Sequence, residues 1–273
     1  MLDDLYRSYT LVFTMRSGSN ALCDLLRRNG LGAPGEWFQQ PLSAAEGEAW
    51  RDTFVRFIRS HQAEGTFGSK MSHDHRARLD ESLRAAIPGY QRLDDIFPAH
   101  RWVWLSRRDK VLQAISQCRA ETSGRWALSE ADFGPPGTYD YDYFHILSRV
   151  LMIESAELTW EIYFRQHGLE PYRIVYEDFF ADVEREFPRL VEYLGGLPPG
   201  RSSIDFGQSF QVQRDETNYA LRERFISDLQ RIGETGFAEE LGEANRRWMQ
   251  FFVDRQWRPP HATAWDDGKS LSD

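Results

Sequence analysis

A short stretch near the amino terminus combines the residue types that bind anions. The six residues Met15–Asn20 (MRSGSN) contain one guanidinium, two hydroxyl groups and a glycine. They follow an apolar run, YTLVFT, that predicts a strand, and they precede ALCDLLRRNG, which predicts a helix. The amino terminus of a helix has unpaired N–H groups and a partial positive charge, so a small-residue turn at this point suits phosphate or sulfate.

We therefore predict an anion site in this loop, in which backbone N–H groups surround the anion and glycine allows a close approach. The guanidinium adds a full charge and a two-pronged donor. The predicted contacts come from five consecutive residues: Arg16, Ser17, Gly18, Ser19 and Asn20. The alternative is an ordinary turn before a helix capped by Ser19. The pattern GxxxxGK[ST] of P-loop kinases is absent, which argues against a nucleoside or metabolite kinase.

A second basic turn repeats this arrangement later in the chain. The apolar run RWVWLS is followed by Arg107 and Arg108 and then by a predicted helix that contains Ser116. Ser116 lies about two turns into that helix and is therefore able to face the same anion. The alternative is a pair of surface arginines with a solvated serine. Two anion sites at one edge of a sheet predict a ligand with two separated phosphate groups.

The elements that must position these turns alternate between strands and helices. Predicted strands cover residues 9–14, 66–72, 101–109 and 171–179. Predicted helices cover residues 21–30, 44–62, 76–97 with an interruption at Pro88–Gly89, 110–126, 143–168 and 181–196, with a further helical stretch to about Val253. This alternation predicts an α/β fold with a central parallel sheet flanked by helices. Both basic turns follow strand carboxyl ends, the edge at which such sheets bind ligands.

Composition restricts the class of protein. The chain has 273 residues, of which 41% are hydrophobic, so we expect one domain over residues 1–273 with a flexible tail at about 261–273. A net charge of −9 argues against an overall basic nucleic-acid binder. Cys23 and Cys118 are expected to be buried thiols, and no metal site is expected. No apolar run has the length of a membrane span and no signal peptide is visible, so the expected compartment is the cytoplasm. A homodimer is left open.

Several pieces of the chain together resemble a known family. The segments are YTLVFTMRSGSNALCDLLRRNG, GEWFQQ, FGSKMS, RRDKVLQAISQCRAETSGRW and QVQRDE, in the same order and at similar spacings. They resemble the sulfotransferases that use 3′-phosphoadenosine-5′-phosphosulfate (PAPS), and among these the bacterial trehalose 2-sulfotransferase group most of all. The likeness to rhizobial nodulation-factor sulfotransferases is weaker. The resemblance implies a P-loop-like sulfotransferase fold.

The resemblance also implies a role for each basic turn. The first loop, Arg16–Asn20, would grip the 5′-phosphosulfate, with Arg16 also acting in catalysis. Many animal members have lysine where Arg16 stands, which is a mild departure. The 3′-phosphate would fall to Arg107 and Ser116, with Arg108 as a second candidate. Arg214, in the late QVQRD stretch, would lie near the 3′-phosphate or the adenine.

On the acceptor side, the resemblance implies that Glu36 is the catalytic base; a solvated loop carboxylate is the alternative. The rival bases are His73, His75 and His145, although His73 and His75 are more often plain surface residues. Candidate acceptor contacts are aromatic faces, one cation and one imidazole: Trp37, Phe38, Trp126, Lys70 and His73. For the aromatic residues, core packing is the alternative.

The function that follows is a PAPS-dependent O-sulfotransferase that sulfates a hydroxyl group of a carbohydrate or glycolipid. Alternatives are a sulfotransferase of a small natural-product alcohol and a non-catalytic nucleotide-binding module of the same fold. The presence of Glu36 favours an enzyme over a binding module.

Overall fold

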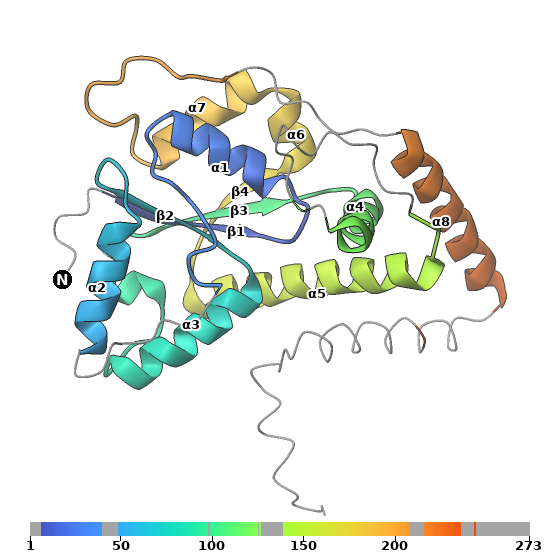
Figure 1. Ribbon diagram of the computed structural model, residues 1–273, viewed down its shortest axis with the longest axis horizontal. Coiled ribbons are helices and arrows are strands. Elements are labelled where there is room, and N and C mark those ends of the chain that lie inside the picture. The colour runs from blue at the N-terminus through green and yellow to red at the C-terminus, as the bar shows by residue number, and fades with distance from the viewer. Residues whose placement is uncertain are drawn as a thin grey trace, which may run out of the picture.

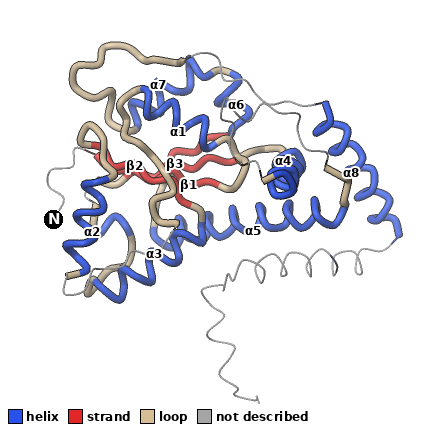
Figure 2. The backbone as a smooth tube through the Cα atoms, viewed as in Figure 1, coloured by secondary structure: helices blue, strands red, loops and turns tan. Residues whose placement is uncertain are grey.

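The computed structural model describes residues 7–39, 49–97, 99–124, 126, 139–207, 216–235 and 243. Four parallel strands form a central sheet in the order β2-β1-β3-β4 (Figures 1 and 2). The strands are β1 (Arg7–Phe13), β2 (Thr66–Met71), β3 (Arg101–Ser106) and β4 (Tyr172–Val175). The predicted α/β fold with a parallel sheet is therefore confirmed.

Helices cover both faces of this sheet (Figure 1). On one face lie α1 (Ser19–Arg28), α6 (Tyr176–Ala181) and α7 (Val183–Tyr193). On the other lie α2 (Trp50–Ser60), α3 (His73–Ala86) and the long α5 (Tyr143–His167), together with a short 3₁₀ turn, η1 (Leu93–Asp95). Beyond the carboxyl end of β3, α4 (Lys110–Ser123) packs against α5 and α8 (Glu216–Thr235).

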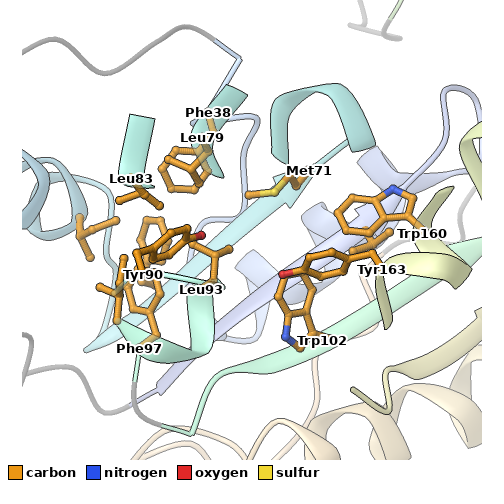
Figure 3. Close-up of a cluster of buried hydrophobic side chains, with 14 of the residues drawn as sticks. Phe38, Met71, Leu79, Leu83, Tyr90, Leu93, Phe97, Trp102, Trp160 and Tyr163 are labelled. Atoms are coloured by element: carbon orange, nitrogen blue, oxygen red, sulfur yellow. The ribbon is translucent and has the colours of Figure 1, made fainter. Parts of the chain in front are cut away.

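Side chains of the central strands alternate between two hydrophobic clusters. On β1, Leu11 enters the cluster with α1 and α7, whereas Val12 enters the cluster with α2, α3 and α5. On β3, Val103 joins the first cluster and Trp102 the second. Figure 3 shows the second, aromatic-rich cluster. All seven residues of β1 are buried, as expected for a parallel strand that is covered on both faces.

Both cysteines are buried free thiols, as predicted. Burial raises the pKa of Cys23 to about 11 and that of Cys118 to about 12, so both thiols are protonated at neutral pH. None of the described helices has the length and apolar character needed to cross a membrane.

Two strands end earlier in the structure than the sequence predicts. The sequence predicts a strand over residues 171–179, but β4 ends at Val175 and Tyr176 begins α6. β4 ends at Val175 because its pairing with β3 ends there: the last pair between the two strands joins Ser106 to Val175. Beyond this pair β3 offers no further strand residue, so the chain turns into a helix. Similarly, β3 ends at Ser106, before the basic turn.

Helix boundaries also differ from the prediction. The predicted helix over residues 181–196 is shorter in the structure, since α7 begins at Val183 after a break at Asp182. The interruption at Pro88–Gly89 is confirmed, because α3 ends at Ala86. Of the late helical stretch the structure describes α8 and residue 243, and the proposed tail lies outside the described residues.

Candidate active site

The two basic turns meet at one edge of the sheet. β1 and β3 are adjacent parallel strands, so the loops that follow Phe13 and Ser106 leave the sheet side by side. Arg16 Nε donates a hydrogen bond to Ser116 Oγ at 3.0 Å. Arg107 Nη1 lies 3.5 Å from the carbonyl oxygen of Arg16, at the upper limit for a hydrogen bond. The prediction that both turns open at the same edge is confirmed.

The first loop, residues 14–20, leaves the amino terminus of α1 uncapped. Gly18 is the N-cap residue, and no side chain of the described residues accepts a hydrogen bond from the first turn of the helix. The alternative interpretation, a cap by Ser19, is therefore wrong, because Ser19 is already the first helical residue. Arg16 and Gly18 have left-handed backbone angles (φ 62° and 92°). Left-handed residues within a turn direct neighbouring N–H groups into a shared concavity that suits an anion.

Gly18 is also required by a close approach. A Cβ atom at this position would lie 2.4 Å from Cδ2 of Tyr176, which is closer than non-bonded atoms approach. The ring of Tyr176 therefore rests directly on the backbone of the first loop. Only glycine satisfies both the positive φ and this contact.

Arg16 and Arg107 form a local concentration of positive charge in a chain that is negative overall. Burial and the neighbouring Arg107 guanidinium lower the pKa of Arg16. Ser17 Oγ and Arg107 Nε are buried and have no hydrogen-bond partner among the described residues. Unpaired buried donors are costly, so a protein tends to keep them where a ligand or solvent completes them. The residues at this edge therefore fit a polyanionic ligand.

The second turn, residues 107–109, is closed by carboxylates of the chain itself. Asp109 Oδ1 caps α4 by accepting from the N–H of Leu112 at 2.9 Å. The carboxylate of Glu177 accepts from the N–H groups of Arg108 and Asp109, at 2.8 and 3.1 Å. The exposed side chain of Arg108 is hydrogen bonded to Asp178. The sequence predicted the same arrangement for both turns, but only the first has an open helix amino terminus.

On the other side of the first loop, Lys70 connects two candidate residues. Its Nζ lies 2.8 Å from Glu36 Oε1 and donates to Asn20 Oδ1 at 2.7 Å. Lys70 is buried, whereas the side chain of Glu36 is 35% exposed. Glu36 reaches this place because the preceding residue, Gly35, pairs with Ser69 on β2. The loop after α1 thus bends back over the sheet edge, as predicted.

The aromatic candidates occupy three different environments. Trp37 is half-buried, donates from Nε1 to the carbonyl oxygen of Gly68 at 2.9 Å, and packs on His61. Phe38 is only 2% exposed and belongs to the aromatic-rich cluster, which is the core-packing alternative considered for it. Trp126 is 38% exposed, and its carbonyl oxygen accepts from Arg16 Nη1 at 2.6 Å. Trp126 therefore lies beside the first loop, while Phe38 lies in the core.

The three histidines proposed as rival bases lie on two different helices. His73 and His75 begin α3, directly after β2. His75 is buried, so its interpretation as a plain surface residue is wrong. Burial lowers the pKa of both imidazoles, which favours their neutral forms. His145 lies on α5, where its Nε2 is 3.0 Å from Glu121 Oε2.

Two contributors to the site were not identified from the sequence. Gln113, fully buried on α4, donates from Nε2 to Thr14 Oγ1 at 2.8 Å and to the carbonyl oxygen of Met15 at 2.7 Å, which fixes the start of the first loop. Its spacing of three residues from Ser116 places both on one helix face and was an available signal. The other is the pair Tyr176–Glu177, which directly follows the carboxyl end of β4, where sheets of this kind bind ligands.

Arg214 lies outside the described residues. Within the ranges that the structure describes, no group of three or more His, Cys, Asp or Glu side chains is arranged to hold a metal ion.

Part of the chain matches a known family. The model of a family described as Stf0 sulphotransferase matches residues 43–228, which is more than half of the chain. The matched range contains Lys70, the second turn and Tyr176–Asp178, and begins after the first loop and Glu36. A search of curated proteins gives no match.

Proposed function

The chain belongs to the Stf0 sulphotransferase family and is a sulfotransferase, and we propose that it transfers a sulfuryl group from PAPS to a hydroxyl group of a carbohydrate or glycolipid. One observation carries this proposal. The uncapped amino terminus of α1 lies between the arginines Arg16 and Arg107 and the Lys70–Glu36 pair. This arrangement supplies an anion site and a candidate base on opposite sides of one loop.

The residues fit a donor with two phosphate groups. When bound, PAPS supplies the sulfuryl group and the nucleotide phosphate that leaves. The first loop would hold the 5′-phosphosulfate through Arg16, the hydroxyls of Ser17 and Ser19, and the N–H groups from Gly18 to Asn20. The unpartnered Ser17 Oγ and the uncapped helix support this assignment.

The 3′-phosphate would be bound beside the second turn. Arg107 is our first candidate, because its guanidinium lies against the first loop, and Ser116 lies within hydrogen-bond distance of Arg16. Arg108 is the second candidate, and its side chain would have to leave Asp178. Arg214 is proposed to contact the 3′-phosphate or the adenine.

In catalysis, this chain mainly positions groups and neutralises charge, by analogy with phosphoryl transfer. Arg16 and the loop N–H groups would stabilise negative charge that grows on the leaving phosphate oxygen and the sulfate oxygens. Because these donors are already oriented by Gln113 and Ser116, little reorganisation accompanies the reaction.

Glu36 would accept the proton of the acceptor hydroxyl as that oxygen attacks. Its ion pair with Lys70 fixes the position of the carboxylate relative to the first loop. A positioned base usually contributes about 10²–10⁴-fold to the rate. The proposed acceptor contacts around it are Trp37, Phe38, Lys70, His73 and Trp126; contact with Phe38 would require its ring to leave the core.

The test is a sulfation assay. The protein is incubated with PAPS and a panel of sugars, glycolipids and small alcohols, and mass spectrometry looks for an acceptor that has gained one sulfate. Glu36→Gln is the matched control. Sulfation of small alcohols alone would replace the acceptor class. Failure to use PAPS with every acceptor, combined with failure to bind adenosine 3′,5′-bisphosphate, would contradict the proposed donor.

A further inference from the structure

The first three residues of α6, directly after β4, contact both basic turns. The ring of Tyr176 rests on Gly18 of the first loop. Glu177 accepts from two N–H groups of the second turn, and Asp178 is paired with Arg108. The segment Tyr176–Asp178 therefore lies between the two places where the chain concentrates positive charge.

Glu177 binds the second turn as an external anion would. Its Oε2 accepts from the N–H of Arg108 and its Oε1 from the N–H of Asp109, so each oxygen satisfies one of two successive donors. Both of these residues precede the helical segment of α4. The carboxylate thus keeps these N–H groups from any ligand, and it fixes the backbone from which the Arg107 side chain leaves.

Arg107 is held on three sides. Its Nε lies 3.7 Å from Glu177 Oε1, too far for a hydrogen bond but close enough for charge attraction. Its guanidinium carbon lies 5.1 Å from the centre of the Tyr176 ring, within range of a cation–π interaction. Its Nη1 points to the carbonyl oxygen of Arg16. The guanidinium is therefore directed toward the first loop and away from bulk solvent.

We propose that Glu177 is a positioning residue that holds Arg107 for the 3′-phosphate of the nucleotide, and so sets the preference for nucleotides that carry this group. The inference rests on the proposed function, since it assumes a donor with a 3′-phosphate. Although Glu177 is negative, its charge is already shared between two N–H dipoles and a guanidinium. Its main effect on a nearby phosphate is thus through the direction of Arg107.

A role for Glu177 confined to α6 does not account for this geometry. An acidic residue in the first turn of a helix is expected to interact with the N–H groups of its own helix. Both oxygens of Glu177 instead accept from the turn that precedes a different helix, α4, across 68 or 69 residues of sequence. Its neighbour Asp178 has the same charge but forms an exposed ion pair, which makes it a matched control.

The experiment measures binding of adenosine 3′,5′-bisphosphate and of AMP by calorimetry to wild type, Glu177→Gln and Asp178→Asn. Glutamine keeps one acceptor oxygen but brings an N–H₂ group against the second N–H donor. We expect the ratio of the two affinities to fall about tenfold in Glu177→Gln. In Asp178→Asn we expect a change within about twofold, because exposed ion pairs contribute little.

A double-variant cycle with Arg107→Ala separates positioning from general destabilisation. If Glu177 acts through Arg107, then Glu177→Gln lowers the ratio in the wild-type background but leaves it unchanged once Arg107 is alanine. An equal fall in both backgrounds, or an unchanged ratio in Glu177→Gln, would overturn the inference while leaving the donor proposal intact. Circular dichroism and thermal unfolding check that each variant is folded. Glu177→Asp gives a second measurement of the affinity ratio, because the shorter side chain does not reach both N–H groups.

The failure of the proposed function has a different result. If wild-type protein did not discriminate between the two nucleotides, the 3′-phosphate assignment would be wrong, and the role of Glu177 would be wrong with it. The 3′-phosphate assignment and the role of Glu177 are both supported if wild type discriminates between the two nucleotides, if Arg107→Ala and Glu177→Gln reduce this discrimination, and if Asp178→Asn keeps it.

Discussion

The first and second basic turns have the same sequence pattern but different structures. Each follows a buried strand of the sheet and precedes a helix, and each contains arginine. At the first turn the helix has no side-chain cap, and the loop holds two left-handed residues. At the second, Asp109 caps the helix and Glu177 takes the N–H groups before it. A basic turn is therefore an open anion site only where the chain does not already supply the acceptor.

We propose different tasks for the two turns. In our proposal, the first turn contacts the reacting group through backbone N–H groups and Arg16. The second presents side chains only, through Arg107 and Ser116. Substitutions at the first turn should therefore reduce catalysis, and substitutions at the second should reduce affinity or stability.

The largest expected effect is that of Arg16→Ala. Loss of the guanidinium at the proposed site of the leaving phosphate should lower turnover by about 10³-fold, because such donors act mainly in the transition state. Arg16→Lys keeps the charge without the fork and should retain part of the activity. Steady-state kinetics at saturating PAPS measures both. An alanine variant with near wild-type turnover would remove the catalytic role from the first turn.

A smaller loss is expected for Glu36→Gln, which tests whether the first turn works together with a base. Glutamine keeps the shape but does not accept a proton, so turnover should fall by about 10²-fold while nucleotide binding is unchanged. If the variant kept full activity, the base would have to be sought among His73, His75 and His145.

Gly18→Ala tests the close packing of the first loop. Alanine there must adopt a positive φ and displace the ring of Tyr176, whose Cδ2 would be 2.4 Å from the new Cβ. The matched control is Gly168→Ala at the end of α5, where φ is also positive but no described atom lies within 4 Å. The control should cost about 1–2 kcal/mol of unfolding free energy. Gly18→Ala should cost about 1–3 kcal/mol more because of the displaced ring. Equal losses in urea unfolding would argue against the contact.

The smallest expected effects compare the two helix amino termini directly. Asp109→Ala removes the cap of α4 and should lower the free energy of unfolding by about 1 kcal/mol. Ser19→Ala removes a hydroxyl that caps nothing and should change it by less than about 0.5 kcal/mol. Chemical denaturation of the two variants measures the difference. A destabilisation by Ser19→Ala as large as that by Asp109→Ala would mean that the first helix is capped in solution.

Much of the fold follows from the sequence because parallel strands that are buried on both faces are continuous apolar runs. The strands that contain Leu11 and Val103 have this pattern, and their positions were predicted to within a few residues. The end of β4 was not predicted. It depends on where β3 stops pairing, which is a property of two strands together and leaves no mark in the local sequence of Tyr176–Phe179.

The site was predictable to the extent that it depends on local order along the chain. The first loop and the edge shared by both turns follow from strand ends. Glu177 and the second turn are far apart in the sequence, so no local sequence pattern predicts the hydrogen bonds between them. Similarly, the sequence offered Phe38 both as an acceptor contact and as a core residue. Its neighbours in the aromatic-rich cluster come from distant elements, so only the folded chain distinguishes the two.

The contacts of Lys70 have a consequence for the order of events in the reaction. One ammonium group connects Asn20, in the loop proposed to hold the donor, with Glu36, proposed to meet the acceptor. A ligand at the first loop that attracts the Lys70 ammonium group weakens the ion pair between Lys70 and Glu36. Thermodynamic linkage then requires that the donor and the acceptor change each other's affinity by the same factor. Because they share one cation, the donor site and the acceptor site are thermodynamically coupled. Binding of the first substrate therefore changes the affinity of the protein for the second.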